Sequence, residues 1–244
     1  MGLRSTHPYF VKNSRVKTDN EPVADNIVWS IAALPVLTTA MSAANAKIIS
    51  TGPLPDNEAR WIKLTRINYR DANGTPRTWE SAERRTRPAG TEIDGVGIVA
   101  ILEKPGGKEI VLQKQYRPPI DMVTVEVPAG LVDAGESAEQ AAVRELREET
   151  GYVGVPTETS PVMYNDPGFC NTNLRMVHMS VDMSLAENQN PKPQLEDDEF
   201  IEVFTVKLAD LWDECKKLQG QGCAIDARVG TLAEGVLLAK KLAP

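Results

Sequence analysis

The sequence predicts an α/β fold, an α/β/α sandwich with a mixed β-sheet, preceded by a small antiparallel β unit. Three observations support this prediction. Apolar strand-like runs alternate with helix signals through most of the chain of 244 residues. The segment at residues 130–152 has the pattern of a loop, a helix and a second loop. Nearer the N-terminus, two strand-like runs flank Asn73-Gly74, a dipeptide typical of tight β-hairpin turns.

The expected elements follow one another along the chain. The hairpin strands are expected at residues 61–70 and 75–80. The next two strands are joined across the turn-forming segment Pro105-Gly106-Gly107. Asp226 would cap the last helix. The remaining strands are predicted at residues 95–102, 110–116, 122–127, 162–164, 174–181 and 200–206, and the last two helices at residues 208–218 and 227–242.

Residues 1–54 differ in composition from the rest of the chain. Residues 1–18 carry Lys and Arg but no acid, and residues 26–46 carry no charge. We expect an N-terminal extension that is disordered or serves as a removable organelle-targeting segment. A secretory signal or a membrane span fits poorly, because Pro35 interrupts a stretch rich in Ala, Ser, Thr and Asn. Gly2 and Thr6 match the myristoylation pattern only weakly.

Net charge and the cysteine and histidine counts argue against several functions. The net charge of −7 argues against non-specific binding to nucleic acid. The three cysteines are odd in number and lack metal-ligand spacing. They predict no zinc site and a reduced compartment, the cytoplasm, with a mitochondrial or nuclear pool as an alternative. One of the two histidines, His178, lies among apolar residues of a strand-like run, which favours packing over a Ser-His-Asp triad.

The helix within residues 130–152 has clear end signals. Ser137 stands at the N-cap and Gln140 three residues later completes a capping box. Gly151 is placed to end the helix in a left-handed conformation. Alanine and leucine at helical spacing supply the face that packs inward.

Three carboxylates of this helix share one face. Glu145, Glu148 and Glu149 stand at i, i+3 and i+4, where like charges destabilise a bare helix. A charged surface helix would account for a lone E-x-x-E-E but not for the whole pattern. A divalent cation accounts for the cluster, and carboxylates with little histidine or cysteine nearby suit Mg²⁺, or Mn²⁺ as a substitute. Arg144 and Glu136 are interpreted as structural partners of these glutamates.

The segment from Gly130 to Tyr152 resembles the signature box of the Nudix hydrolase family. Tyr152 is its one departure, since an aliphatic residue is more usual there. Beyond the box, residues 61–242 are similar to the ADP-ribose pyrophosphatase branch, particularly its eukaryotic ADP-sugar pyrophosphatase members. The segments that carry this resemblance are W-I-K-L at 61–64, R-T-W-E-S at 77–81, Q-Y-R-P-P at 115–119, E-V-P-A-G at 126–130, N-D-P-G at 165–168 and D-E-F-I-E-V at 198–203.

The resemblance implies a domain plan and an activity. Residues 55–91 would form a β unit exchanged between the subunits of a homodimer, and residues 92–244 would form the Nudix hydrolase domain. The enzyme would hydrolyse the pyrophosphate bond of ADP-ribose, and of related nucleoside diphosphate sugars, to AMP and ribose 5-phosphate with Mg²⁺ as cofactor. Neither nucleic acid nor a membrane is an expected partner.

The resemblance also implies catalytic roles. Glu145, Glu148 and Glu149 would bind the metal together with the backbone carbonyl of Ala129. Glu199 ends an acidic, proline-rich loop, from which a mobile carboxylate would act as general base. The alternative is that this loop is only a solvated acidic surface, in which case Glu148 is the first candidate for the base.

The substrate-binding residues implied by the resemblance lie mostly outside the box. Trp61, supplied by the partner subunit, and Trp79 would sandwich the adenine, with packing inside the hairpin as the alternative. Glu80 would hydrogen-bond the adenine edge. The others are Arg84 and Arg117, as clamps on phosphate or ribose oxygens, Leu131, and Asp166, which would touch the terminal ribose or only form a turn.

Two other functions stay open from the sequence. The same chemistry on another nucleotide sugar or an oxidised nucleotide would use the same box. A non-catalytic sensor would bind ADP-ribose without turnover, although such a protein has no need for clustered like charge.

Overall fold

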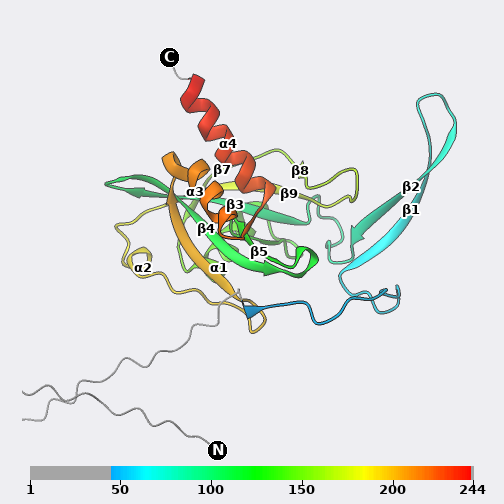
Figure 1. The fold of residues 1–244 in the computed structure, drawn as a ribbon, viewed down its shortest axis with the longest axis horizontal. Coiled ribbons are helices and arrows are strands. Elements are labelled where there is room, and N and C mark those ends of the chain that lie inside the picture. The colour runs from blue at the N-terminus through cyan, green and yellow to red at the C-terminus, as the bar shows by residue number, and fades with distance from the viewer. Residues whose placement is uncertain (1–44, 243–244) are drawn as a thin grey trace, which may run out of the picture. The chain divides into compact units, whose positions relative to one another are not determined.

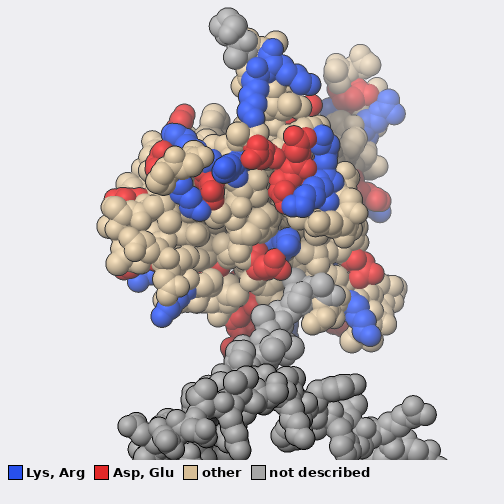
Figure 2. Space-filling view, turned by 60° about the vertical axis from the view of Figure 1, so that its left-hand side comes forward, with Lys and Arg blue, Asp and Glu red and all other residues tan. Residues whose placement is uncertain are grey.

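The computed structural model describes residues 45–242, all within one unit, Thr39–Pro244. The expectations for the first 44 residues, including the targeting segment and the myristoylation pattern, fall outside this range. Among the described helices, none has both the length and the apolar composition needed to cross a bilayer. Figure 2 shows one face of the molecule, on which acidic and basic side chains are interspersed and no broad basic patch forms.

The N-terminal β unit is a two-stranded antiparallel hairpin, β1 (Ile62–Arg70) and β2 (Pro76–Arg84). Its turn is organised by Asp71, whose carboxylate accepts from the N–H groups of Asn73 and Thr75 at 3.0 and 2.9 Å. Gly74 has a φ of +78°, which glycine adopts without strain. The hairpin reaches away from the main sheet (Figure 1), and Trp61, Leu64 and Trp79 expose about half or more of their surface.

The main sheet has nine strands and is mixed, as predicted. Its path runs β11-β5-β4-β3-β9-β7, with β10 on β4, β6 on β3 and β8 on β9. The pairs β3–β9 and β5–β11 are parallel, and the other pairs are antiparallel. The strands are β3 (Gly95–Lys104), β4 (Gly107–Arg117), β5 (Met122–Glu126), β6 (Ala129–Leu131), β7 (Val155–Thr159), β8 (Met163–Tyr164), β9 (Asn173–Val181), β10 (Ile201–Lys207) and β11 (Ala224–Ile225).

Helices cover both faces of this sheet, so the three-layer prediction is confirmed. Helix α1 (Ala138–Thr150) packs Ala141, Ala142 and Leu146 on one face, each with no exposed surface. Helices α3 (Leu211–Gly220) and α4 (Ala227–Leu242) pack on the other. Two 3₁₀ turns and a four-residue helix, α2 (Ala186–Gln189), lie in the connections. Figure 1 shows α3 and α4 together on one side of the strands.

The ends of α1 follow the signals in the sequence. Ser137 accepts from the N–H of Gln140 at 3.2 Å, and the Gln140 side chain accepts from the N–H of Ser137 at 2.8 Å. Gly151 has a φ of +74° and ends the helix. A Cβ there would fall 2.2 Å from the backbone N of Lys192, so glycine is also required by close packing of a later loop.

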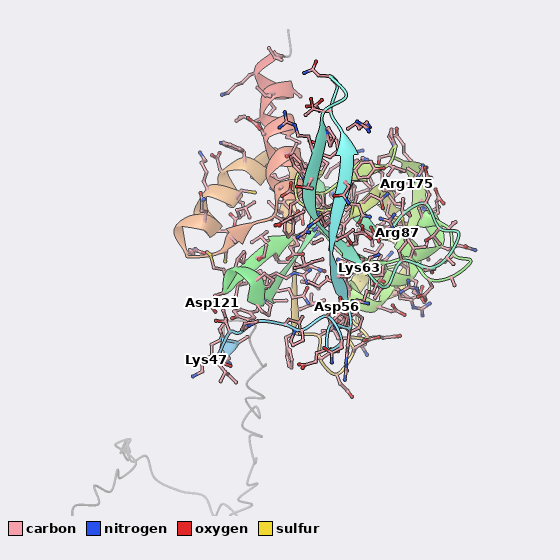
Figure 3. The ribbon with its side chains drawn as sticks, turned by 90° about the vertical axis from the view of Figure 1, so that its right-hand side faces the viewer. Lys47, Asp56, Lys63, Arg87, Asp121 and Arg175 are labelled. Carbon is pink, nitrogen blue, oxygen red and sulfur yellow. The ribbon has the colours of Figure 1, made fainter. Side chains whose placement is uncertain are left out.

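A buried ion pair anchors the segment between the hairpin and the sheet. Asp94 is 3% exposed and accepts from Arg87, with one bond of 2.9 Å and one of 2.5 Å, and from the N–H of Asn173 at 3.0 Å. Although burial alone would raise the pKa of Asp94, the bonds from Arg87 and Asn173 lower it. Figure 3 shows Arg87 beside the base of the hairpin. This cluster therefore ties the hairpin's exit to β9.

Some elements were not predicted. Strands β6 and β11 have three and two residues, and β7 contains Pro156 beside an irregularity in its register. Their pairing depends on neighbours that are distant in sequence, which local patterns do not reveal. β2 also continues to Arg84, beyond the predicted end at residue 80, because its last three residues pair with the start of β1.

Candidate active site

Arg144 organises the carboxylates of α1 and of the loop before it. Its guanidinium donates to both oxygens of Glu136, at 3.0 and 2.9 Å, to Glu145 at 2.8 Å and to Glu148 at 3.2 Å. A further bond to the carbonyl of Leu131, at 3.0 Å, ties the helix to β6. These bonds agree with the interpretation of Arg144 and Glu136 as partners that hold the cluster together.

Glu149 is the most buried carboxylate of the cluster, with 4% of its surface exposed. One of its oxygens accepts from the N–H of Ala129 at 2.9 Å, and the other accepts from the side-chain amide of Gln113 at 3.2 Å. Burial raises the pKa of Glu149 to about 8. The negative charges of Glu145 and Glu199 add to this rise, while the two hydrogen bonds oppose it. The site thus crowds carboxyl groups where water solvates negative charge poorly, and this opposes ionisation of Glu149 in the absence of a cation.

Glu145 lies directly against the backbone of Gly130. A Cβ at residue 130 would fall 1.9 Å from the Glu145 carboxyl carbon, so a side chain there would displace this carboxylate. Burial raises the pKa of Glu145, and Arg144 opposes that rise. The structure therefore brings Glu145 together with the turn that carries Ala129. The Glu148 side chain is 44% exposed and lies at the edge of this group.

The donor set fits a hard divalent cation in its chemistry. It consists of carboxylates crowded at low exposure beside a backbone turn, and these are oxygen donors of the kind that Mg²⁺ and Mn²⁺ prefer. Within residues 45–242, no three Asp, Glu, His or Cys side chains stand in a ready-made metal geometry. Arg144 pairs with both Glu145 and Glu148, so a cation would compete with this guanidinium for them.

The loop that carries Glu199 is fastened to α1. The N–H of Gln194 donates to the carbonyl of Glu148 at 2.7 Å. In the acidic run at residues 196–199, Glu199 is half-buried and its three neighbours are exposed. The charge of Glu199 lies close enough to raise the pKa of Glu149. The structure thus brings Glu199, alone of this acidic run, toward the helical carboxylates.

Arg117 is held by a buried carboxylate on the neighbouring strand. Its Nε and Nη2 groups donate to the two oxygens of Glu126, both at 2.7 Å, and the Glu126 side chain is 3% exposed. This pairing raises the pKa of Arg117. Arg228 lies 3.8 Å from the same carboxylate and is itself paired with Asp226 at 2.7 and 2.9 Å. The Nη1 group of Arg117 is not used in this pair and makes no hydrogen bond to another residue between 45 and 242.

A cavity of about 1010 Å³ lies beside these arginines. Of the predicted substrate-binding residues, Arg84, Arg117 and Leu131 line it, as does Ala129 of the metal site. Arg84 is exposed and has no ion-pair partner among residues 45–242, so its guanidinium is available to an anion. The predicted arginine clamp therefore shares this cavity with the predicted metal site through Ala129, while Glu145, Glu148 and Glu149 do not line it.

The two tryptophans lie far apart within one chain. Trp79 is opposite Ile67. The carbonyl of Trp61 accepts from the N–H of Arg85, which lies six residues after Trp79 and just beyond the end of β2. That spacing corresponds to roughly 20 Å along the hairpin. Trp79 also donates from its indole to the carbonyl of Gly168 at 3.1 Å. One chain alone does not bring the two indoles to one base, so a sandwich needs a second copy.

Glu80 and Asp166 are exposed. Glu80 lies on the opposite face of β2 from Trp79, because successive side chains of a strand alternate. The carbonyl of Asp166 accepts from the N–H groups of Phe169 and Cys170, at 3.0 and 2.8 Å, which forms a turn. The turn is therefore present, and contact between the Asp166 side chain and a ribose stays a prediction.

Several site residues were not predicted as such. Gln113 supports Glu149, Glu126 holds Arg117, and Arg228 lines the cavity. The available signal was a polar residue inside a predicted strand, as at Gln113 and Glu126. Asp226 was predicted only as a helix cap, and it does accept from the N–H of Arg228 at 2.8 Å. Its second role, holding the Arg228 side chain, depends on where α4 begins.

Comparison with known proteins places this site in a family. Residues 92–223 match the family described as the NUDIX domain. The chain is 52% identical over 200 residues to the ADP-ribose pyrophosphatase of Saccharomyces cerevisiae, covering 81% of this chain and 86% of that protein. It is 38% identical over 175 residues to the ADP-sugar pyrophosphatase of Mus musculus, covering 71% of this chain and 80% of that protein.

One similar solved structure is described as an ADP compounds hydrolase. It has a TM-score of 0.50 and 16% sequence identity, and the match covers 76% of this chain and 91% of that chain. At this level of identity the likeness supports the fold.

Proposed function

The chain belongs to the NUDIX family, and we propose that it hydrolyses the pyrophosphate bond of ADP-ribose and related nucleoside diphosphate sugars, with AMP and ribose 5-phosphate as the products from ADP-ribose. The observation that carries the proposal is the carboxylate cluster beside an arginine-lined cavity, in a chain 52% identical to an ADP-ribose pyrophosphatase. In this reaction water forms a bond to one phosphorus, the bond to the bridging oxygen breaks, and the water proton passes to a base.

Mg²⁺, or Mn²⁺ in its place, would be held by Glu145, Glu148, Glu149 and the carbonyl of Ala129. When bound, the metal would neutralise phosphate oxygens and so let a nucleophile approach. The chain's own contribution is to fix these donors. Arg144 holds Glu145 and Glu148, and the Ala129 N–H fixes one oxygen of Glu149.

Glu199 is the proposed general base. Its loop is attached to α1 through Gln194, and Glu199 is less exposed than the acidic residues beside it. A carboxylate in this position is able to accept the proton of the attacking water. Glu148, which lies at the edge of the cluster, is the alternative base.

Arg84 and Arg117 would bind phosphate or ribose oxygens. Arg84 lines the cavity and has no ion-pair partner in the described part of the chain, and Arg117 is oriented by Glu126 through its Nε and Nη2 groups. Two guanidiniums on one cavity suit a pyrophosphate, because each presents planar donors to phosphate oxygens. Leu131 lies on the same wall and would contact the substrate there.

The adenine site would be completed by a homodimer. The hairpin exposes apolar side chains on both faces, which a two-stranded unit cannot bury alone. Exchange of this unit, residues 55–91, would bring Trp61 of the partner subunit to Trp79, with Glu80 at the adenine edge. The cytoplasmic location is proposed on the free state of the three cysteines, which form no disulfide.

A substrate panel tests the proposed activity. The full chain with Mg²⁺ is incubated with ADP-ribose, other ADP-sugars, UDP- and GDP-sugars and an oxidised nucleoside triphosphate, and the products are identified by mass. We expect the highest kcat/KM for ADP-ribose. A higher kcat/KM for an oxidised nucleotide would replace the proposal with the alternative substrate, and tight binding of ADP-ribose without products would identify a sensor.

A further inference from the structure

We propose that Gln113 is a positioning residue for the carboxylate of Glu149, and that it acts on metal binding through that carboxylate. This inference rests on the proposed function, because it takes Glu149 as a metal ligand. Gln113 lies on β4, a strand whose neighbouring residues Val111 and Leu112 belong to the apolar core. It is the polar side chain through which this strand reaches the carboxylate cluster of α1.

The geometry around Glu149 is the first step. One oxygen receives the backbone N–H of Ala129 at 2.9 Å, and the other receives Nε2 of Gln113 at 3.2 Å. The two donors come from different elements, the turn into β6 and the middle of β4. With one donor on each oxygen, rotation of the carboxylate is opposed from both sides. Each oxygen keeps lone-pair capacity for a further partner.

The Gln113 amide presents its N–H₂ group to Glu149. This is the orientation that Glu149 requires when it is ionised to bind a metal, because an ionised carboxylate only accepts hydrogen bonds. Its oxygen then points away, and no described residue donates to this buried atom. Gln113 has no exposed surface at all. An apolar side chain of the same size would avoid this buried, unpaired acceptor, so packing alone does not explain an amide here.

The position of Gln113 also links the two halves of the site. On the neighbouring strand, the residue directly opposite Gln113 is Glu126, the carboxylate that holds Arg117. Arg117 lies four residues further along β4, on the same face as Gln113. One strand pair therefore supports both the Glu149 carboxylate and the arginine proposed to bind the substrate. Support of the carboxylate by an amide is the kind of contact that tunes metal affinity.

The test is direct binding of Mn²⁺ to the metal-free full chain. Electron paramagnetic resonance measures the concentration of the free ion and so gives the affinity. Gln113→Met keeps the length of the side chain and removes its donor. We expect Mn²⁺ affinity to fall by about 10- to 100-fold, the range found when partners of metal ligands are lost. Gln113→Asn keeps a buried amide but withdraws it by one methylene, and we expect a loss in the same direction. If the methionine variant fails to fold, the Mn²⁺ affinity of the asparagine variant tests the inference.

Gln115→Met is the matched control, since Gln115 lies on the same strand face and makes no side-chain hydrogen bond within residues 45–242. Its Mn²⁺ affinity should equal that of the parent. Melting temperatures in EDTA distinguish a positioning role of Gln113 from a purely structural one. A purely structural role would lower the melting temperature of the Gln113 variants without metal and leave their Mn²⁺ affinity unchanged. Equal Mn²⁺ affinity of the parent and both Gln113 variants would overturn the inference while the proposed function stands. Absence of Mn²⁺ binding by the parent would overturn the metal site itself, and the inference with it.

Discussion

The carboxylate cluster and the N-terminal hairpin contrast in how complete they are within one chain. The cluster is assembled from α1, β4 and β6, and each carboxylate is held by named donors. The hairpin has two strands, exposed apolar side chains, and tryptophans spaced far apart. Under the proposed function, one chain would hold the metal and the pyrophosphate, and a second copy would be needed to recognise the base. Changes in the cluster should therefore affect kcat, and changes in the hairpin should affect KM and assembly.

The largest effect is expected at Glu149. Glu149→Gln removes one charged ligand of the metal, so kcat should fall by several orders of magnitude as several kcal/mol of transition-state stabilisation are lost. The fold should persist, because the amide occupies the same volume. Turnover is measured at limiting and at saturating Mg²⁺, with circular dichroism as the control for folding. Near-normal turnover at limiting Mg²⁺ would remove Glu149 from the metal site.

The next effect is expected at Glu199. Glu199→Gln should lower kcat by ~10²–10⁴-fold, the usual contribution of a general base, and leave the affinities for Mg²⁺ and substrate nearly unchanged. Glu196→Gln and Asp198→Asn are matched controls, since both side chains are exposed on the same loop. The measurement is kcat at saturating metal and substrate. If Glu199→Gln turns over like the parent, Glu148 becomes the first candidate for the base.

The ion pair at the hairpin's exit should affect stability rather than chemistry. Asp94→Asn removes a buried charge from its partner Arg87 and should lower the free energy of unfolding at pH 7 by about 1.5–3 kcal/mol. Because the folded state lowers the pKa of Asp94 below 3.8, its contribution is fully present above pH 3.8. It is lost as pH falls through the lowered value. Urea unfolding of parent and variant should therefore differ at pH 7 and converge below pH 3.8, and a gap that does not narrow would contradict this assignment.

The smallest effect is expected at the tryptophans. Trp61→Ala should raise KM for ADP-ribose by the equivalent of roughly 1–3 kcal/mol of stacking and change kcat little. Trp79→Ala should act in the same direction. Loss of the dimer or of folding in these variants would mean that the indoles are packing residues.

Mixing subunits sharpens this prediction. If Trp61 serves the partner's site, a mixed dimer of Trp61→Ala and Glu149→Gln chains contains one site with both wild-type residues. The mixture should then recover a fraction of sites with the parent's KM. A mixture that shows only the raised KM would place Trp61 in its own chain's site, against the ~20 Å separation expected from the register of the hairpin.

Features that depend on local sequence were predictable, and contacts between distant elements were not. The layers, the hairpin turn at Gly74 and the capping box at Ser137 were predictable, because each depends on local spacing or on a residue's own conformational preference. The resemblance implied that Glu145, Glu149 and the carbonyl of Ala129 bind one metal. Glu149 accepts from the N–H of Ala129 at 2.9 Å, and metal binding by this group stays a prediction.

The contacts that were not predicted join elements distant in sequence. The bond between Gln113 and Glu149 spans 36 residues, and the contact between Arg228 and Glu126 depends on the parallel pairing of a two-residue strand. Local periodicity carries no information about such pairs. The distance between the two tryptophans likewise followed only from the register of the hairpin.

The most direct test of the central claim is product analysis with the full chain, Mg²⁺ and ADP-ribose in water enriched in oxygen-18. The account predicts AMP and ribose 5-phosphate in equal amounts, with one labelled oxygen in one of the two products. Turnover by Glu149→Gln should be lower by several orders of magnitude. Intact ADP-ribose after prolonged incubation with the parent chain, or products without label, would contradict hydrolysis at the carboxylate cluster.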